Sequence, residues 1–160
     1  MSELVAARVL GCLPRAVAAY ILELPVMLTS RTILVMDDDQ DVLSLLQRFL
    51  ENHGYQVRLA SDGEEGLALA RELRPDLVLL DMLMPRLSGF GVLVRLKADG
   101  EAAPSVIMMT ANGSQQHQSY AHFLGVDDYL TKPFPLARLL EAVQRLCPLP
   151  QPMATSAAVD

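Results

Sequence analysis

Between residues 32 and 146, two kinds of segment alternate along the chain. The first kind is a short apolar run of strand length. The second kind follows each run and has apolar residues at every third or fourth position, the period of a helix with one buried face. The run at 77–80 is apolar throughout, as expected of a strand with both faces covered. This alternation predicts an α/β fold with five helices and a parallel sheet of five strands, at 32–36, 56–60, 77–80, 106–109 and 129–131.

The predicted helices differ in how clearly their apolar faces are marked. The last one, at 136–146, carries Leu or Val along one face. The fourth, near 116–124, has a weak apolar stripe because His117, Gln118 and His122 interrupt it. We therefore expect the fourth helix to be the most loosely packed.

Polar side chains follow four of the five predicted strands. They are Asp37, Asp38 and Asp39 after the first strand, Asp81 after the third, Thr110 after the fourth and Lys132 after the fifth. Crossovers between parallel strands are right-handed, so the loops that follow the strands open at the same edge of the sheet. The sequence therefore predicts that these side chains gather at the carboxyl edge.

Each of these residues alone has an ordinary structural explanation. Asp residues after a strand usually cap a helix or a turn, Thr110 could end a strand, and Lys132 could be a surface charge. Several carboxylates at one edge would repel one another, however, and a hard cation such as Mg²⁺ removes that cost. An Asp nucleophile beside Mg²⁺, a lysine and a hydroxyl are the groups that phosphoryl transfer to a carboxylate needs. We therefore interpret the cluster as a phosphorylation site.

The composition is that of an ordinary folded domain with acidic charge. The chain has 160 residues, 51% hydrophobic and 20% charged, which suits one domain with one core. The net charge is -6 and no basic stripe is present, so we expect neither nucleic acid nor a membrane surface as a partner. Another protein is the expected downstream target. The two cysteines lack a metal-binding spacing and suit a reducing, cytoplasmic compartment.

Four segments resemble the motifs of response-regulator receiver domains. They are ILVMDDDQD at 33–41, LVLLDMLMPRLSG at 77–89, VIMMTA at 106–111 and DDYLTKPF at 127–134. The resemblance covers about residues 31–147 and implies a flavodoxin-like, doubly wound sheet with strand order 2-1-3-4-5. It also implies a single-domain, CheY-like switch in a two-component phosphorelay. Such a switch takes its phosphoryl group from a histidine kinase or a phosphotransfer protein.

The resemblance assigns the nucleophile and the Mg²⁺ ligands by position. Asp81 is the expected phosphoacceptor and also contacts the metal. Asp38 would bind the metal directly, Asp37 would bind it through water, and the backbone carbonyl of Leu83 would be the third protein ligand. Asp39 matches a position that is often acidic but not essential, so it is not expected among the ligands.

The resemblance also assigns the residues of the switch. Lys132 would pair with the phosphoryl oxygens. Thr110 would donate its hydroxyl to the phosphoryl group and move inward, and Tyr129 would swing into the vacated space. A cis peptide bond before Pro133 and a response on the face of the fourth helix and fifth strand are implied too. At most weak self-phosphorylation and self-dephosphorylation are expected, so we predict a switch and not an enzyme.

Two side chains near the expected site bear on how long the phosphoryl group would last. Leu83 lies two residues after Asp81, and Asn112 lies two residues after Thr110. In the family that the chain resembles, these two side chains flank the path of the hydrolytic water. Because Leu83 cannot orient a water molecule, we predict slow self-dephosphorylation.

Two other classes of function use a similar fold and stay open. The first is an interaction module without phosphorylation, which the full set of site residues disfavours. The second is a metal-dependent phosphatase, for which Asp37 and Asp39 would form a DxD pair, but Asp81 would have no role. The sequence does not decide the cognate kinase, the output target or whether a phosphorylation-dependent dimer forms.

The two ends of the chain lie outside the resemblance. Residues 1–30 form an amino-terminal extension of unknown role. Their helical spacing allows a docking helix that Pro14 would kink, whereas Met27 closely precedes a natural-looking start, so the extension could also be non-native. Residues 31–147 are the expected receiver domain, and residues 148–160 are typical of a flexible tail. This tail is too short to fold alone, so we expect no output domain after the last helix.

Overall fold

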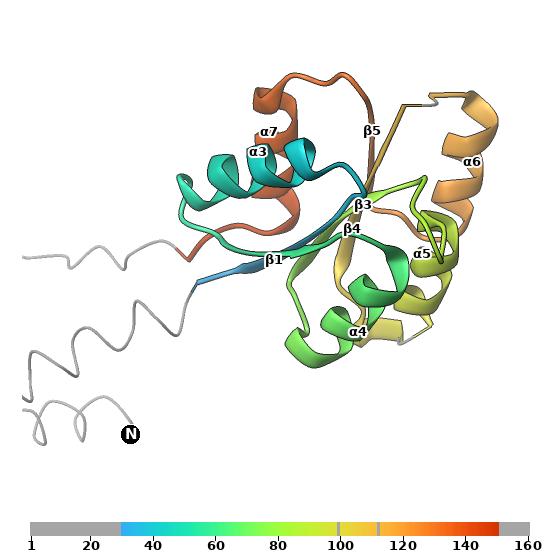
Figure 1. The fold of residues 1–160 in the computed structure, drawn as a ribbon, viewed down its shortest axis with the longest axis horizontal. Coiled ribbons are helices and arrows are strands. Elements are labelled where there is room, and N and C mark those ends of the chain that lie inside the picture. The colour runs from blue at the N-terminus through green and yellow to red at the C-terminus, as the bar shows by residue number, and fades with distance from the viewer. Residues whose placement is uncertain (1–29, 99, 112, 151–160) are drawn as a thin grey trace, which may run out of the picture. The chain divides into compact units, whose positions relative to one another are not determined.

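A computed structural model describes residues 30–98, 100–111 and 113–150 (Figure 1). Its five strands are all parallel and lie side by side in the order β2-β1-β3-β4-β5. Their bounds are β1 (Thr32–Met36), β2 (Gln56–Ala60), β3 (Leu77–Asp81), β4 (Ser105–Thr110) and β5 (Asp128–Thr131). The predicted fold class and strand order are confirmed, and the first two strands have the predicted bounds.

Five helices and one short 3-10 turn accompany the sheet in the described part of the chain. They are α3 (Gln40–Glu51), α4 (Gly63–Leu73), α5 (Gly89–Lys97), the 3-10 turn (Gly100–Ala102), α6 (Gln115–Phe123) and α7 (Leu136–Leu146). Figure 1 shows α3 and α7 on one face of the sheet and α4, α5 and α6 on the other. Helices thus cover both faces, so the central strands are apolar on both sides.

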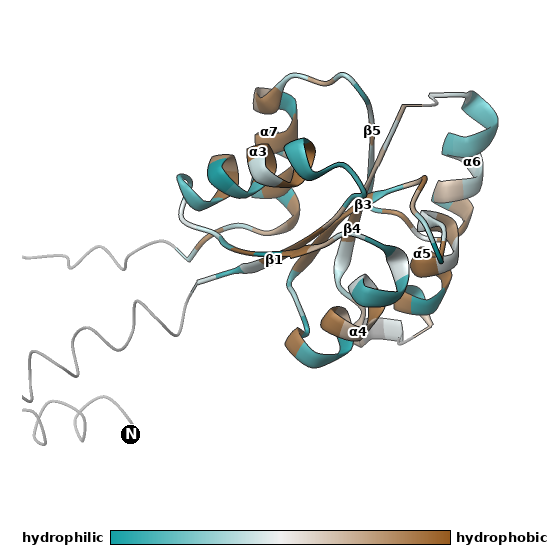
Figure 2. Cartoon of the chain, viewed as in Figure 1, coloured by the Kyte–Doolittle hydropathy of each residue, from teal (hydrophilic) through white to brown (hydrophobic). Residues whose placement is uncertain are grey.

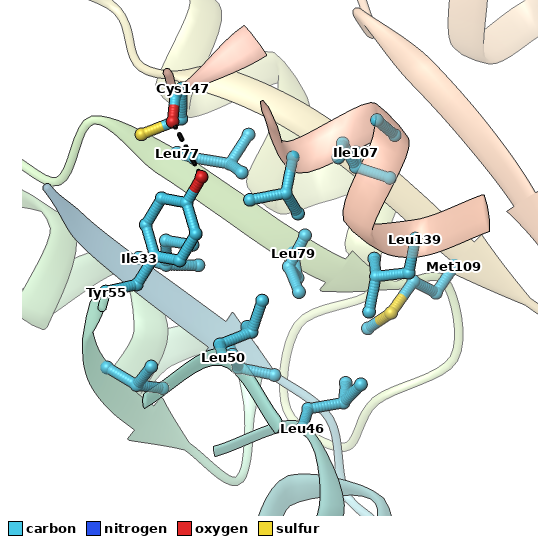
Figure 3. Close-up of a cluster of buried hydrophobic side chains, with 14 of the residues drawn as sticks. Ile33, Leu46, Leu50, Tyr55, Leu77, Leu79, Ile107, Met109, Leu139 and Cys147 are labelled. Atoms are coloured by element: carbon cyan, nitrogen blue, oxygen red, sulfur yellow. Dashed lines mark hydrogen bonds between the residues drawn. The ribbon is translucent and has the colours of Figure 1, made fainter. Parts of the chain in front are cut away.

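The first core lies between the sheet and helices α3 and α7 (Figure 3). Alternate residues of β1, β3 and β4 point into it, among them Ile33, Leu79 and Ile107. The hydroxyl of Tyr55 also lies in this core and donates a hydrogen bond to the backbone carbonyl of Cys147 at 3.1 Å. The bond ties the start of β2 to the end of α7 and pairs a buried polar group.

The second core lies on the opposite face, under α4, α5 and α6. Leu34, Val78 and Met108 supply the sheet side of this core, one residue out of phase with the first set. In Figure 2 the central strands are coloured as hydrophobic, whereas much of α6 is hydrophilic or neutral. Ala121 is the only residue of α6 that is buried, so the prediction of a loosely packed fourth helix is confirmed.

Side-chain caps begin most of the helices. Asp39, Asp62, Ser88 and Ser114 accept hydrogen bonds from backbone N–H groups in the first turns of α3, α4, α5 and α6. These bonds satisfy donors that have no partner within the helix. Each cap follows a strand or its loop, so capping fixes where the loops at the carboxyl edge turn into helices.

Several sequence-based predictions concern residues outside the described part. They include the amino-terminal extension up to residue 29, the tail from residue 151 and the side chain of Asn112. Within the part that is described, no helix is both long enough and apolar enough to span a bilayer.

Candidate phosphoacceptor site

Asp81 is the last residue of β3, the central strand of the sheet. Its side chain is almost completely buried, with 5% of the residue exposed. The backbone N–H of Leu83 donates a hydrogen bond of 2.7 Å to Oδ2 of this carboxylate. The strand was predicted to stop at residue 80, but Asp81 still pairs with Met109 of β4. Sheet pairing therefore fixes the backbone that carries the carboxylate.

Lys132 joins Asp81 to Asp37. Its Nζ lies 2.7 Å from Oδ1 of Asp81 and 2.6 Å from Oδ2 of Asp37. Asp37 follows β1 and is 1% exposed. The three residues come from positions 37, 81 and 132 of the chain, and parallel strands that end at the same edge bring them together. The structure thus shows two buried carboxylates held by one ammonium group.

Burial and charge pull the pKa values at this site in opposite directions. Burial raises the pKa of Asp81 and outweighs the hydrogen bond and charge of Lys132, which lower it; the nearby charge of Asp37 raises it further. Burial lowers the pKa of Lys132, but its hydrogen bonds to Asp37 and Asp81 outweigh burial and leave this pKa raised. The ammonium group therefore stays charged, and by formal charge it faces two carboxylates.

Thr110 and Tyr129 lie beside this cluster on the next strands. Thr110 is the last residue of β4, is 1% exposed, and has its Oγ1 3.7 Å from Sδ of Met82. The backbone N–H of Lys132 donates a hydrogen bond to the carbonyl of Thr110 at 2.7 Å. Burial raises the pKa of Tyr129, and a side-chain hydrogen bond with Thr110 opposes this effect. The cis peptide bond expected before Pro133 is present.

The expected Mg²⁺ ligands differ in how far they are exposed. Asp37 and Asp81 share Lys132, whereas the side chain of Asp38 is exposed. In the part of the chain that is described, no three His, Cys, Asp or Glu side chains form a group that could hold a metal ion. The donors nevertheless fit a hard divalent cation chemically, because two buried carboxylates with excess negative charge stand next to a third, exposed carboxylate in sequence. Asp38 and the carbonyl of Leu83 remain predicted ligands.

The other acidic residues near the motifs have structural partners. Asp39 caps α3 through hydrogen bonds from the N–H groups of Asp41 and Val42. Asp127 accepts hydrogen bonds from Nζ of Lys97 and from the N–H of Val106. The helix cap gives Asp39 a structural role, so the DxD pair of the phosphatase alternative gains no support.

One ion pair between a buried carboxylate and an exposed arginine escaped the sequence analysis. Asp62 is 2% exposed, caps α4 through Oδ1 and pairs with the guanidinium of Arg86 through Oδ2. Arg86 belongs to the loop between β3 and α5 and has a positive φ of 64°. The pair therefore joins the loop that follows Asp81 to the start of α4. The sequence signal for the cap is Asp62 directly before Gly63, Glu64 and Glu65, but nothing in the sequence pairs it with Arg86.

Curated relatives match most of the chain. The DNA-binding dual master transcriptional regulator RpaA of Synechocystis is 44% identical over 115 residues. These residues make up 71% of this chain and 48% of RpaA. The chain thus spans about half the length of the curated relatives it matches.

This relative corrects one prediction from charge. We expected nucleic acid to be excluded as a partner, but RpaA is named as a DNA-binding protein, so that exclusion is wrong. The physical reason is that the net charge of -6 counts only the residues of this chain, whereas the matched segment makes up only about half of such relatives. Those relatives can contact phosphates through residues that this chain does not match.

Solved structures agree with the fold and with the sequence motifs. The chemotaxis protein CheY4 of Vibrio cholerae superposes with a TM-score of 0.69 at 28% identity, covering 73% of this chain and 98% of CheY4. A CheX–CheY–BeF₃–Mg²⁺ complex of Borrelia burgdorferi gives 0.69 at 25% identity, covering 72% and 88%. The sequence profile of the response regulator receiver domain matches residues 33–144. Profile, relatives and fold together show that this chain belongs to the response-regulator receiver domain family.

Proposed function

We propose that Asp81 accepts a phosphoryl group from the phosphohistidine of a histidine kinase or a phosphotransfer protein. The observation that carries this proposal is the contact of Lys132 with both Asp81 and Asp37 at 2.7 and 2.6 Å. A buried carboxylate with one paired ammonium group and a raised pKa is a reactive group and a poor structural one. The family itself is one of signalling switches and not of classical enzymes.

The reaction forms one bond and breaks one bond. An oxygen of the Asp81 carboxylate attacks phosphorus, the P–N bond of the donor breaks, and its electron pair stays on the histidine nitrogen, which takes up a proton. The product is an acyl phosphate on Asp81. Lys132 contacts Oδ1 of Asp81 before the reaction, so its ammonium group lies within reach of the phosphoryl oxygens afterwards.

Mg²⁺ is the cofactor that this donor set suits. Asp37 and Asp81 would hold it, with Asp38 and the carbonyl of Leu83 as further ligands. When bound, the ion supplies positive charge to the phosphoryl oxygens and orients the donor. The excess negative charge of the two buried carboxylates over Lys132 supports this proposal, because a cation would neutralise it.

The signal would arise from new charge and new acceptor oxygens at the end of β3. Phosphorylation adds about one further negative charge to Asp81 and three oxygens that can accept hydrogen bonds. Thr110 is buried at the end of the neighbouring strand, and we propose that its hydroxyl donates a hydrogen bond to them. Tyr129 shares a hydrogen bond with Thr110 and would move with it. The altered surface would be that of α6 and β5.

Intact-mass measurement after incubation with Mg²⁺ and a small phosphodonor tests the proposal. We expect one added phosphoryl group on the wild-type chain and none on Asp81→Asn. Omission of Mg²⁺ should abolish the addition. Asp76→Asn is a matched control, because Asp76 is an ion-paired Asp away from the site and should leave phosphorylation intact.

The same experiment separates the other two classes of function. A chain that consumes the phosphodonor in every variant without gaining mass would be a phosphatase. A chain that neither gains mass nor consumes the donor would be an interaction module. Either result overturns the assignment of Asp81 as phosphoacceptor.

A further inference from the structure

A surface cavity lies far from Asp81, at the amino-terminal edge of the sheet. It has a volume of about 530 Å³ and is lined by residues of α4, of α5 and of the segments that lead into β3 and β4. Pro75 and Pro104 line it shortly before these strands begin, whereas Asp81 and Thr110 are the last residues of the same strands. The length of the sheet therefore separates this cavity from the phosphoacceptor site.

Three arginines line the cavity. Arg71 and Arg74 come from the end of α4, one helical turn apart, and Arg95 comes from the facing helix α5. None of the three has an ion-pair or hydrogen-bond partner among the described side chains. Lys97, by contrast, is occupied by Asp127 and by the carbonyl of Pro104. The cavity thus gathers three positive charges, and its described lining includes no Asp or Glu.

Helix dipoles account for only part of this charge. A helix end carries roughly half a negative charge, and both α4 and α5 end at the cavity. The three guanidinium groups exceed the two helix ends together by about two positive charges. One basic side chain in the last turn of each helix would be enough to offset the helix dipoles, and these side chains would not need to line the same cavity. The excess positive charge therefore favours an anion of two or more charges.

The remaining lining is apolar. Leu67, Ala70 and Leu96 are buried residues of the second core, and they line the same hollow as the arginines. Arginine side chains bind phosphate oxygens through parallel N–H groups, and apolar residues bind the non-polar body of a ligand. The volume of about 530 Å³ falls within the usual range for small-molecule sites.

We propose that this cavity binds a small molecule that carries two or more phosphate-type charges and an apolar body. The site is independent of phosphoryl transfer at Asp81. Pyrophosphate and ADP serve as probes, because they share the charge and only ADP has the apolar body. Adenosine has the body without the charge.

Backbone amide NMR shifts of the full chain, recorded without Mg²⁺ and at matched ionic strength, test the proposal. We expect saturable shifts with ADP and with pyrophosphate, at residues 67–75 and 95–105, and none with adenosine. The same shifts should appear in Asp81→Asn, because the phosphoacceptor site takes no part. No saturable shift with either anion, equal shifts with adenosine, or shifts centred on Asp81 would overturn the proposal.

Substitutions of the arginines that line the cavity test which charges contribute to binding. Arg71→Gln combined with Arg95→Gln should weaken binding of ADP at least tenfold, because the double variant removes two of the three guanidinium groups that would bind the phosphates. Arg58→Gln is the matched control, because Arg58 is an exposed arginine of β2 outside the cavity. An equal loss of affinity for ADP in Arg58→Gln would show that the effect comes from the overall charge of the chain, and it would overturn the proposal. Binding of pyrophosphate without ADP would overturn the part played by the apolar lining.

Discussion

Nζ of Lys132 lies 2.7 Å from Oδ1 of Asp81, and this contact connects the last strand of the sheet to the central one. The same ammonium group also holds Asp37 at 2.6 Å. One cation thus serves two buried carboxylates, an arrangement that is useful for reaction and unfavourable for folding. Stability measurements on variants can therefore report on the site without any phosphodonor.

Asp81→Asn should stabilise the domain in the absence of Mg²⁺. The substitution removes one of two buried negative charges and leaves Lys132 paired with Asp37 alone. We expect the free energy of unfolding to rise by about 1 kcal/mol at neutral pH, although one hydrogen bond is weakened. Urea denaturation measures the change. A loss of stability on this substitution would contradict the electrostatic interpretation.

The gain in stability expected for Asp81→Asn should depend on pH in one direction. The pKa of Asp81 is raised in the folded state, chiefly by burial, so its ionised form costs stability above that pKa. As the pH falls through the raised pKa towards 3.8, the usual pKa of an Asp side chain, Asp81 becomes neutral in the folded chain and resembles asparagine. The advantage of Asp81→Asn should therefore shrink on the acid side. A gain that grew towards low pH would rule out this cause.

Gly89→Ala should displace Asp81 through the backbone. A Cβ at Gly89 would lie 2.2 Å from the carbonyl oxygen of Asp81 and 2.8 Å from Cα of Met82, and neither atom can move without shifting the strand end. We expect a loss of about 2 kcal/mol in stability and slower phosphorylation. Denaturation and the rate of mass gain measure the two effects.

Gly91→Ala is the matched control in the same helix. A Cβ there would meet Cδ1 of Leu87 at 2.7 Å, and Cδ1 is the end of a flexible side chain. Helix propensity favours alanine by up to about 1 kcal/mol, so this variant should be neutral or slightly stabilised. If both variants behaved alike, close contact with Asp81 would not explain the effect of Gly89→Ala.

The sequence predicted which residues lie at the carboxyl edge of the sheet better than it predicted the contacts between them. The bounds of β1 and β2 were predicted correctly, from an apolar run and from an alternating segment. β3 and β4 end one residue later than predicted because Asp81 and Thr110 still pair with neighbouring strands. Hydropathy cannot show this, since it marks a buried polar residue as the start of a loop.

Side-chain contacts between distant loops could not be predicted from the sequence, for a different reason. Parallel strands place Asp37, Asp81 and Lys132 at one edge whatever their side-chain conformations, so their proximity was predictable. The choice of Lys132 to contact both carboxylates, and the exposure of Asp38, depend on side-chain packing. Pattern and spacing contain no information about such choices.

Arg86→Ala should destabilise the domain through Asp62. Removing the guanidinium leaves Oδ2 of a carboxylate that is 2% exposed without its partner, while the positive φ at position 86 stays. We expect a loss of about 1 kcal/mol, moderated because Arg86 itself is largely exposed. Urea denaturation measures it.

A double-mutant cycle isolates this ion pair. Asp62→Asn keeps an oxygen that can cap α4 but removes the negative charge. In that background Arg86→Ala should cost much less than in the wild-type chain. An equal cost in both backgrounds would show that Arg86 acts through its backbone or its packing and not through Asp62.

Leu83→Asn should shorten the lifetime of the phosphoryl group. The side chain of Leu83 is exposed, with 63% of the residue accessible, while its backbone N–H contacts Oδ2 of Asp81 at 2.7 Å. Its position near the carboxylate is therefore open to water, but leucine offers no group to orient a water molecule for attack on phosphorus. An amide at this position can donate and accept hydrogen bonds, and we expect hydrolysis about tenfold faster.

Intact mass followed over time after removal of the phosphodonor measures this lifetime. Leu45→Asn is the matched control, because Leu45 is an exposed leucine of α3 and should leave the lifetime unchanged. The wild-type chain should lose its phosphoryl group slowly. A half-life of seconds in the wild-type chain that Leu83→Asn does not alter would show that this side chain does not limit access of the attacking water.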